Sequence, residues 1–99
     1  MTARPEMYRY HNGEKAVLPF DDAEYDARLA GLRRIMADTG VDAAVFTSMH
    51  SIAYYSGFLY CAFGRPYGLV VTDADSVTIS AGIDAGQPWR RCHADNITY

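Results

Sequence analysis

Apolar residues recur at helical spacing over one long stretch of the chain. Between positions 25 and 36 they are separated by four, three and four residues, which places them on one face of an α-helix. These apolar residues are Tyr25, Leu29, Leu32 and Met36. Asp21 followed by Glu24 resembles a capping box at the start, and Gly40 is a residue type that commonly ends helices. The pattern predicts a helix from about Asp21 to Thr39.

The segment after this helix favours a strand followed by a second, shorter helix. Residues 41–47 (VDAAVFT) are nearly continuous in apolar character, which indicates a strand covered on both faces. Ser48 is a common helix-capping residue type, and Ser56-Gly57 is typical of a helix end. We therefore expect a short helix from Ser48 to Tyr55.

Three further segments have the composition of strands. The runs Tyr67–Thr72 and Val77–Ala81 are separated by the polar residues 73–76, a connection so short that it forces an antiparallel hairpin. Asn96–Tyr99 has the β-branched and aromatic content of a strand that is just beginning. The sequence stops there without a turn or a cap, so we expect a chain cut from a longer polypeptide.

A helix that leads into a buried strand is typical of α/β proteins, and the hairpin makes the sheet mixed. The predicted fold class is therefore α/β, with a mixed β-sheet and flanking helices. Residues 1–20 show neither the helical nor the strand period and are expected to form an irregular arm with a turn at Asn12-Gly13. Residues 21–99 are expected to form the α/β domain, in an incomplete form.

Composition limits the classes of function. A chain of 99 residues has room for one domain, and its apolar runs are far shorter than the ~18–20 residues of a membrane span. The net charge of −3 arises from 12 acidic and 9 basic residues, so neither a nucleic-acid nor a membrane partner is expected. The start has no apolar core of a signal peptide. We therefore expect a cytoplasmic protein in which Cys61 and Cys92 are reduced thiols.

The sequence lacks the common motifs of nucleophilic catalysis, phosphate binding and metal binding. The serines lack a Gly-x-Ser-x-Gly turn, and the glycines lack the spacings of phosphate-binding loops. His11, His50 and His93 lack the three- or four-residue spacing that places two histidines on one metal ion. We expect structural roles for these histidines, and no catalytic residue, metal or cofactor in this chain.

Residues 60–67 (YCAFGRPY) have the features of an anion-binding loop. Its single cation is Arg65, which lies between Gly64, where the backbone turns easily, and Pro66, which favours an extended conformation at Arg65. A guanidinium offers two parallel donors to a carboxylate, and an adjacent aromatic ring covers the remainder of a small zwitterion. Arg65 is thus a candidate ligand for an anionic substrate; the alternative is an ion pair with a surface acid.

Residues 84–91 (DAGQPWRR) form a second segment with two interpretations. Trp89 beside Arg90 and Arg91 has the composition of an anchor at a protein–protein interface. The alternative is a tryptophan that covers the core, with both arginines in solvent. Neither interpretation assigns catalysis to this segment.

Three segments resemble the amino-terminal domain of creatinases, within the broader creatinase/prolidase superfamily. They are residues 46–56 (FTSMHSIAYYS), 58–67 (FLYCAFGRPY) and 86–91 (GQPWRR). The resemblance extends from about Phe20 onward and implies the amino-terminal fold of this family, with its ribonuclease H-like motif. Ser51 replaces the asparagine usual in creatinases, and Gly57 replaces a common acidic residue. Neither departure lies in the Arg65 loop.

The resemblance also implies an activity. Creatinases are homodimers that hydrolyse creatine to sarcosine and urea without a metal, and a carboxy-terminal "pita-bread" domain performs the proton transfers. The positions of those catalytic residues lie beyond Tyr99. Within this chain, Arg65 corresponds to the arginine that binds the creatine carboxylate and Phe63 to an aromatic residue of the same site. Both would reach into the active site of the partner subunit.

Two alternatives remain open at this point. The chain is also compatible with the amino-terminal domain of a prolidase or Xaa-Pro aminopeptidase relative, whose carboxy-terminal domain would hold two metal ions. A non-catalytic module that dimerises through the Trp89 region is the third interpretation.

Overall fold

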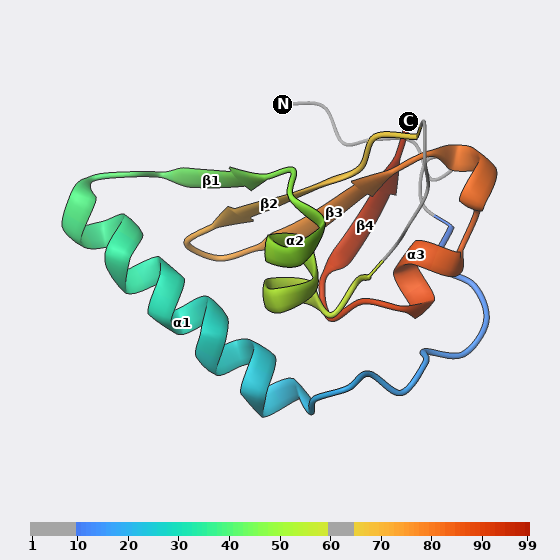
Figure 1. Ribbon diagram of the computed structural model, residues 1–99, viewed down its shortest axis with the longest axis horizontal. Helices are drawn as coiled ribbons and strands as arrows, with labels where there is room; N and C mark the ends of the chain where they lie inside the picture. Colours follow the sequence, from blue (N-terminus) through green and yellow to red (C-terminus); the bar gives the residue numbers. More distant parts are fainter. Residues whose placement is uncertain (1–9, 60–64) are drawn as a thin grey trace.

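The computed structural model describes residues 10–59 and 65–99, which form a single sheet with helices packed against it (Figure 1). The elements are α1 (Asp22–Thr39), β1 (Ala43–Phe46), α2 (Met49–Ser56), β2 (Gly68–Thr72), β3 (Ser76–Ser80), the 3₁₀ turn η2 (Gly82–Asp84), α3 (Gln87–Arg90) and β4 (Asp95–Thr98). Residues 10–20 run along the molecule without helix or strand. Across both described ranges, the helices fall short of the length and apolarity that crossing a bilayer requires.

The sheet is mixed, as predicted. Its strand order is β1-β2-β3-β4; β1 and β3 each pair antiparallel with β2, and β4 pairs parallel with β3. The turn of the predicted β2–β3 hairpin is closed by a hydrogen bond from the Thr72 amide to the Asp75 carbonyl, at 2.9 Å. The fold class predicted from the sequence, α/β with a mixed sheet and flanking helices, is confirmed.

Local capping explains where the two longer helices begin and end. The Asp21 carboxylate accepts the Glu24 amide at 2.9 Å, and Gly40 ends α1 with a φ of 72°. The amide of Val41 donates to the Met36 carbonyl at 2.8 Å, so Val41 belongs to the helix end rather than to the strand. The predicted strand at 41–47 therefore shortens to Ala43–Phe46.

Both helices pack on the same face of the sheet and enclose the core (Figure 1). The core joins side chains of α1, α2 and β2 with the segments that lead into β2 and β4. Its fully or almost fully buried members are Leu29, Met36, Ile52, Phe58, Leu69, Val71, Cys92 and Ala94. The helical face predicted from the apolar spacing is the face that lies against the sheet.

The prediction that the first strand is covered on both faces is wrong. Val45 in β1 is 68% exposed, and the strand register places Val70 and Val77 beside it on the same face of the sheet. The described helices cover the opposite face, which carries Leu69 and Val71. A continuous apolar run shows that a strand has two apolar faces, but whether both are covered depends on the other elements.

The two helix-ending glycines make a matched pair for a stability test. Both have φ values that favour glycine, 72° at Gly40 and 75° at Gly57. A Cβ at Gly40 would meet nothing within 4 Å, whereas one at Gly57 would lie 2.8 Å from the Tyr25 hydroxyl and 2.9 Å from the Leu18 Cδ1.

We expect Gly40→Ala to lower the free energy of unfolding by about 1 kcal/mol, the cost of a left-handed alanine. Gly57→Ala adds overpacking and should cost roughly 1–3 kcal/mol more. Urea denaturation of the two variants measures the difference. Equal losses would show that the contacts of Tyr25 and Leu18 around Gly57 relax without cost.

Candidate functional site

The sequence singles out Phe63 and Arg65, and the structure describes the second. Phe63 lies within residues 60–64, outside the described residues, and so does Cys61. Arg65 lies just before β2, with 42% of its side chain exposed. Its Nη2 donates to the Oδ1 of Asp84 at 3.2 Å. Arg65 therefore forms an ion pair, as the alternative interpretation of the sequence expected. The acid is not on the surface, however, because the Asp84 side chain is 9% exposed.

Asp84 is buried by an unusual orientation of the turn η2. Ile83, its neighbour in the turn, is 81% exposed. Side-chain polarity predicts the opposite arrangement, because apolar groups favour burial and carboxylates favour water. A buried carboxylate is costly unless a cation compensates it. The guanidinium of Arg65 supplies that compensation.

Tyr99 connects the two segments that carry this ion pair. Its hydroxyl donates to the carbonyl of Pro66 at 2.7 Å, next to Arg65 in the chain. Its own carbonyl accepts the amide of Gly82, the first residue of η2, at 2.9 Å. The segment before β2 and the turn after β3 are thus both fastened at the end of β4.

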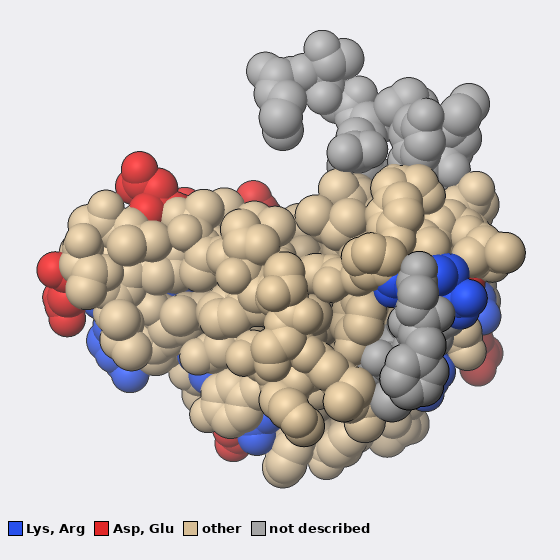
Figure 2. Space-filling view, turned by 45° about the horizontal axis from the view of Figure 1, so that its top comes forward, with Lys and Arg blue, Asp and Glu red and all other residues tan. Residues whose placement is uncertain are grey.

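The arrangement is suited to binding an anion rather than to proton transfer. The guanidinium of a partly exposed arginine can meet a planar carboxylate, and its hydrogen bonds with one would be charge-assisted. Within residues 10–59 and 65–99, no group of three or more His, Cys, Asp or Glu side chains is arranged to hold a metal ion. Figure 2 shows charged side chains at the margins of the face it presents, with a broad uncharged area between them.

Trp89 and Arg90 contact the amino-terminal arm of the same chain, an arrangement that neither interpretation of the sequence predicted. Trp89 stacks on His11, with ring centroids 5.1 Å apart, and the Nζ of Lys15 lies 4.1 Å from the Trp89 ring centroid. The Nη1 of Arg90 donates to the carbonyl and the side-chain oxygen of Asn12 at 3.1 and 2.8 Å. The short helix α3 therefore fastens the chain's own amino-terminal arm.

His93 joins the segment before β4 to the start of α1. Its Nδ1 lies 2.9 Å from a carboxylate oxygen of Asp22, and its Nε2 lies 2.8 Å from one of Asp26. The ring also stacks on Tyr25, with centroids 5.4 Å apart. The sequence shows Asp22 and Asp26 at helical spacing, but the partner 67 residues further on has no local signal. The role of His93 is structural, as expected, while His50 is exposed.

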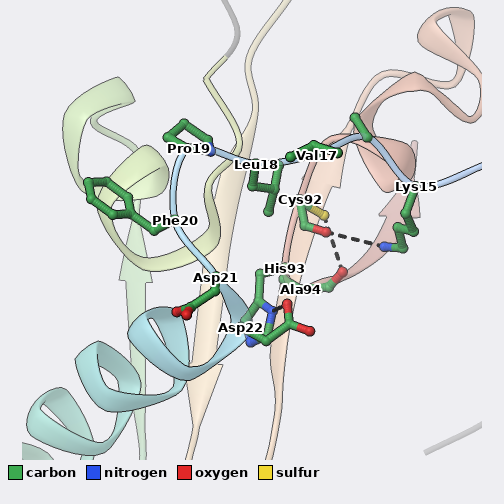
Figure 3. Close-up of a pocket in the computed structure, with 11 residues that line it drawn as sticks. Lys15, Val17, Leu18, Pro19, Phe20, Asp21, Asp22, Cys92, His93 and Ala94 are labelled. Atoms are coloured by element: carbon green, nitrogen blue, oxygen red, sulfur yellow. Dashed lines mark hydrogen bonds and ion pairs between the residues drawn. The ribbon is translucent and has the colours of Figure 1, made fainter.

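A cavity of about 650 Å³ lies between the arm, the start of α1 and the segment before β4 (Figure 3). Lys15 lies at one side of it, and its Nζ donates to the carbonyl oxygens of Trp89 and Cys92 at 2.7 and 3.2 Å. Arg65 does not line this cavity. This cavity and the candidate anion-binding residue are therefore separate features.

Cys92 borders this cavity as a free, buried thiol. Burial raises the pKa of the Cys92 thiol above its ordinary value of 9.0, because the thiolate would lose hydration. As pH rises through 9.0, the Cys92 thiol therefore ionises in the unfolded chain before it does in the folded protein, and its contribution to the free energy of unfolding falls. We expect Cys92→Ala to reduce this loss in urea denaturation at neutral and alkaline pH. Parallel pH profiles for the two proteins would contradict the assignment.

Comparison with known proteins connects the fold to one family. The family model described as Creatinase/Prolidase N-terminal domain matches residues 28–87. A protein named Creatinase, from Bacillus sp. (strain B-0618), is 52% identical over 89 residues, which cover 90% of this chain. The match covers 22% of that relative, so the chain spans about a fifth of its length.

Solved structures show the same fold at lower identity. The N-terminal domain of an X-Pro dipeptidase from Streptococcus pyogenes matches with a TM-score of 0.66 and 20% identity, covering 74% of this chain and 56% of that chain. An Xaa-Pro aminopeptidase from the same species matches with a TM-score of 0.68 and 21% identity, covering 80% of this chain and 59% of that chain. The dipeptidase PepE from Mycobacterium ulcerans matches with a TM-score of 0.68 and 19% identity, covering 81% of this chain and 23% of that chain.

Proposed function

This chain belongs to the Creatinase/Prolidase N-terminal domain family, and from this premise we propose that it is the amino-terminal part of a cytoplasmic creatinase. In that enzyme it binds the carboxylate of creatine and contributes to a homodimer that hydrolyses creatine to sarcosine and urea. The observation that carries the proposal is the 52% identity to the Bacillus creatinase, against 19–21% for the three peptidase-related structures described above.

The proposed role of Arg65 rests on its place and exposure. Creatine is a small zwitterion with a carboxylate at one end, and an arginine binds a carboxylate through paired donors. The Arg65 side chain is 42% exposed; its guanidinium contacts Asp84, and the next residue, Pro66, is hydrogen-bonded to Tyr99. Phe63, two residues before it, is proposed to line the same site.

Catalysis itself is assigned to the rest of the enzyme. Cleavage of the C–N bond in a linear amidine needs a group that moves protons at the guanidino carbon. Holding one end of the substrate cannot replace that group. In this proposal a carboxy-terminal domain supplies it, and the Arg65 loop completes the active site of the partner subunit.

Urea release from creatine by the complete enzyme that carries this chain tests the proposed function. We expect release that survives dialysis against a metal chelator, with no hydrolysis of an Xaa-Pro dipeptide in the presence of Mn²⁺. The 99-residue chain alone is the control and should release no urea. Metal-dependent Xaa-Pro hydrolysis without urea release would instead assign the chain to a peptidase.

A further inference from the structure

We propose that Asp84 is the positioning residue for Arg65: its carboxylate holds the guanidinium in the orientation that receives the substrate carboxylate. This inference rests on the proposed function, because it concerns how Arg65 meets its ligand. Asp84 lies 19 residues after Arg65 in the chain, and no residue pattern in the sequence connects them.

The burial of the Asp84 side chain is the first support. Asp84 is 9% exposed, and its Oδ1 accepts the Nη2 of Arg65 at 3.2 Å. A buried carboxylate requires a compensating cation, whereas an exposed arginine does not require an acid. The contact therefore joins the exposed side chain of Arg65 to the buried side chain of Asp84.

The backbone of the turn is the second support. Ala85, directly after Asp84, has a φ of 50° and is the one non-glycine residue with positive φ in the described part of the chain. Such a conformation is costly for alanine and persists where the surroundings impose it. Here it accompanies a turn that exposes Ile83 and buries Asp84. The turn that carries Asp84 thus departs from two local preferences, the negative φ of a non-glycine residue and the burial of apolar rather than charged side chains. Such departures are characteristic of functional positions.

The anchoring of both segments is the third support. Tyr99 binds the carbonyl of Pro66 through its hydroxyl and the amide of Gly82 through its carbonyl. The main chains that carry Arg65 and Asp84 are therefore held at one end of the sheet. Side-chain contact and main-chain contacts together leave the guanidinium little freedom, so less entropy is lost when an anion binds.

Asp84 also exerts an opposing effect, since its negative charge repels a bound carboxylate. The guanidinium carries the compensating charge between the two anions, and it offsets their repulsion. We therefore expect orientation to dominate, so that loss of the Asp84 charge weakens substrate binding. The opposite sign would mean that Asp84 competes with the substrate for Arg65.

The test is a double-mutant cycle in the complete enzyme, with kcat and KM for creatine measured separately. Asp84→Asn should raise KM roughly five- to thirtyfold with little change in kcat, since ground-state and transition-state binding weaken together. Asp84→Glu keeps the charge and should raise KM about two- to fivefold. Asp73→Asn, at an exposed acid in the β2–β3 turn, is the matched control and should leave both constants unchanged.

The double variant Arg65→Ala/Asp84→Asn should be no worse than Arg65→Ala alone, because Asp84 acts through Arg65. Additive losses, or a lower KM for Asp84→Asn, would overturn the inference. Circular dichroism and gel filtration of each variant distinguish misfolding of the protein from a changed orientation of Arg65. If Asp84→Asn does not fold, Asp84→Glu still tests the role, because it retains the buried charge. If Arg65→Ala itself leaves KM unchanged, the proposed function of Arg65 fails; if only Asp84→Asn is silent, the positioning role alone fails.

Discussion

Replacing Arg65 with alanine in the complete enzyme is expected to lower kcat/KM for creatine by roughly ten- to several-hundredfold, since each lost charged hydrogen bond contributes about 1.5–3 kcal/mol. Arg65→Lys should recover part of this loss, because an ammonium group restores the charge without the planar pair of donors. Steady-state rates of urea release measure both effects.

Arg34→Ala provides the matched control for this prediction. Arg34 is an exposed arginine of α1, on an element that does not carry the anion-binding residue. It should leave kcat/KM close to the wild-type value. Near-wild-type kinetics for Arg65→Ala as well would reduce the contact between Arg65 and Asp84 to a structural ion pair.

Mixed dimers are expected to recover activity that neither parent possesses. One subunit carries Arg65→Ala, and the other carries an inactivated carboxy-terminal domain. If the Arg65 loop serves the partner's site, one site of each mixed dimer combines an intact Arg65 with an intact catalytic domain. Random pairing makes about half of the dimers mixed, so about a quarter of wild-type activity should return.

Co-refolding of the two variants, followed by the urea assay, measures this recovery. If the loop served its own subunit, every site would remain defective in one part or the other. Activity no higher than that of the parent proteins would therefore refute the cross-subunit role. Gel filtration of the mixture provides the control that dimers have formed.

Local signals account for the parts of the fold that could be predicted. Asp21 and Gly40 cap α1 as their positions in the sequence indicate, and Ser48 and Gly57 do the same for α2. The β2–β3 hairpin follows from two apolar runs and a short polar turn. Each of these features depends on residues within a few positions of one another, so the amino-acid pattern is sufficient.

Contacts between distant segments account for what could not be predicted. The helix α3 has four residues, too few to show a period, and its Arg90 binds Asn12 across 78 positions. The burial of Asp84 beside an exposed Ile83 contradicts polarity and depends on a cation 19 residues away. Arg65 itself could be singled out because Pro66 and Gly64 flank it, but its partner could not.

The central claim is that Arg65 binds the carboxylate end of creatine, and a comparison of two substrates tests it most directly. The measurement is the ratio of kcat/KM for creatine to that for its neutral carboxamide, taken in the wild-type enzyme and in Arg65→Ala. If the guanidinium contacts the carboxylate, the wild-type ratio should exceed the variant's by roughly tenfold or more, since a charged hydrogen bond is replaced by a neutral one. The same ratio in both enzymes would contradict the claim.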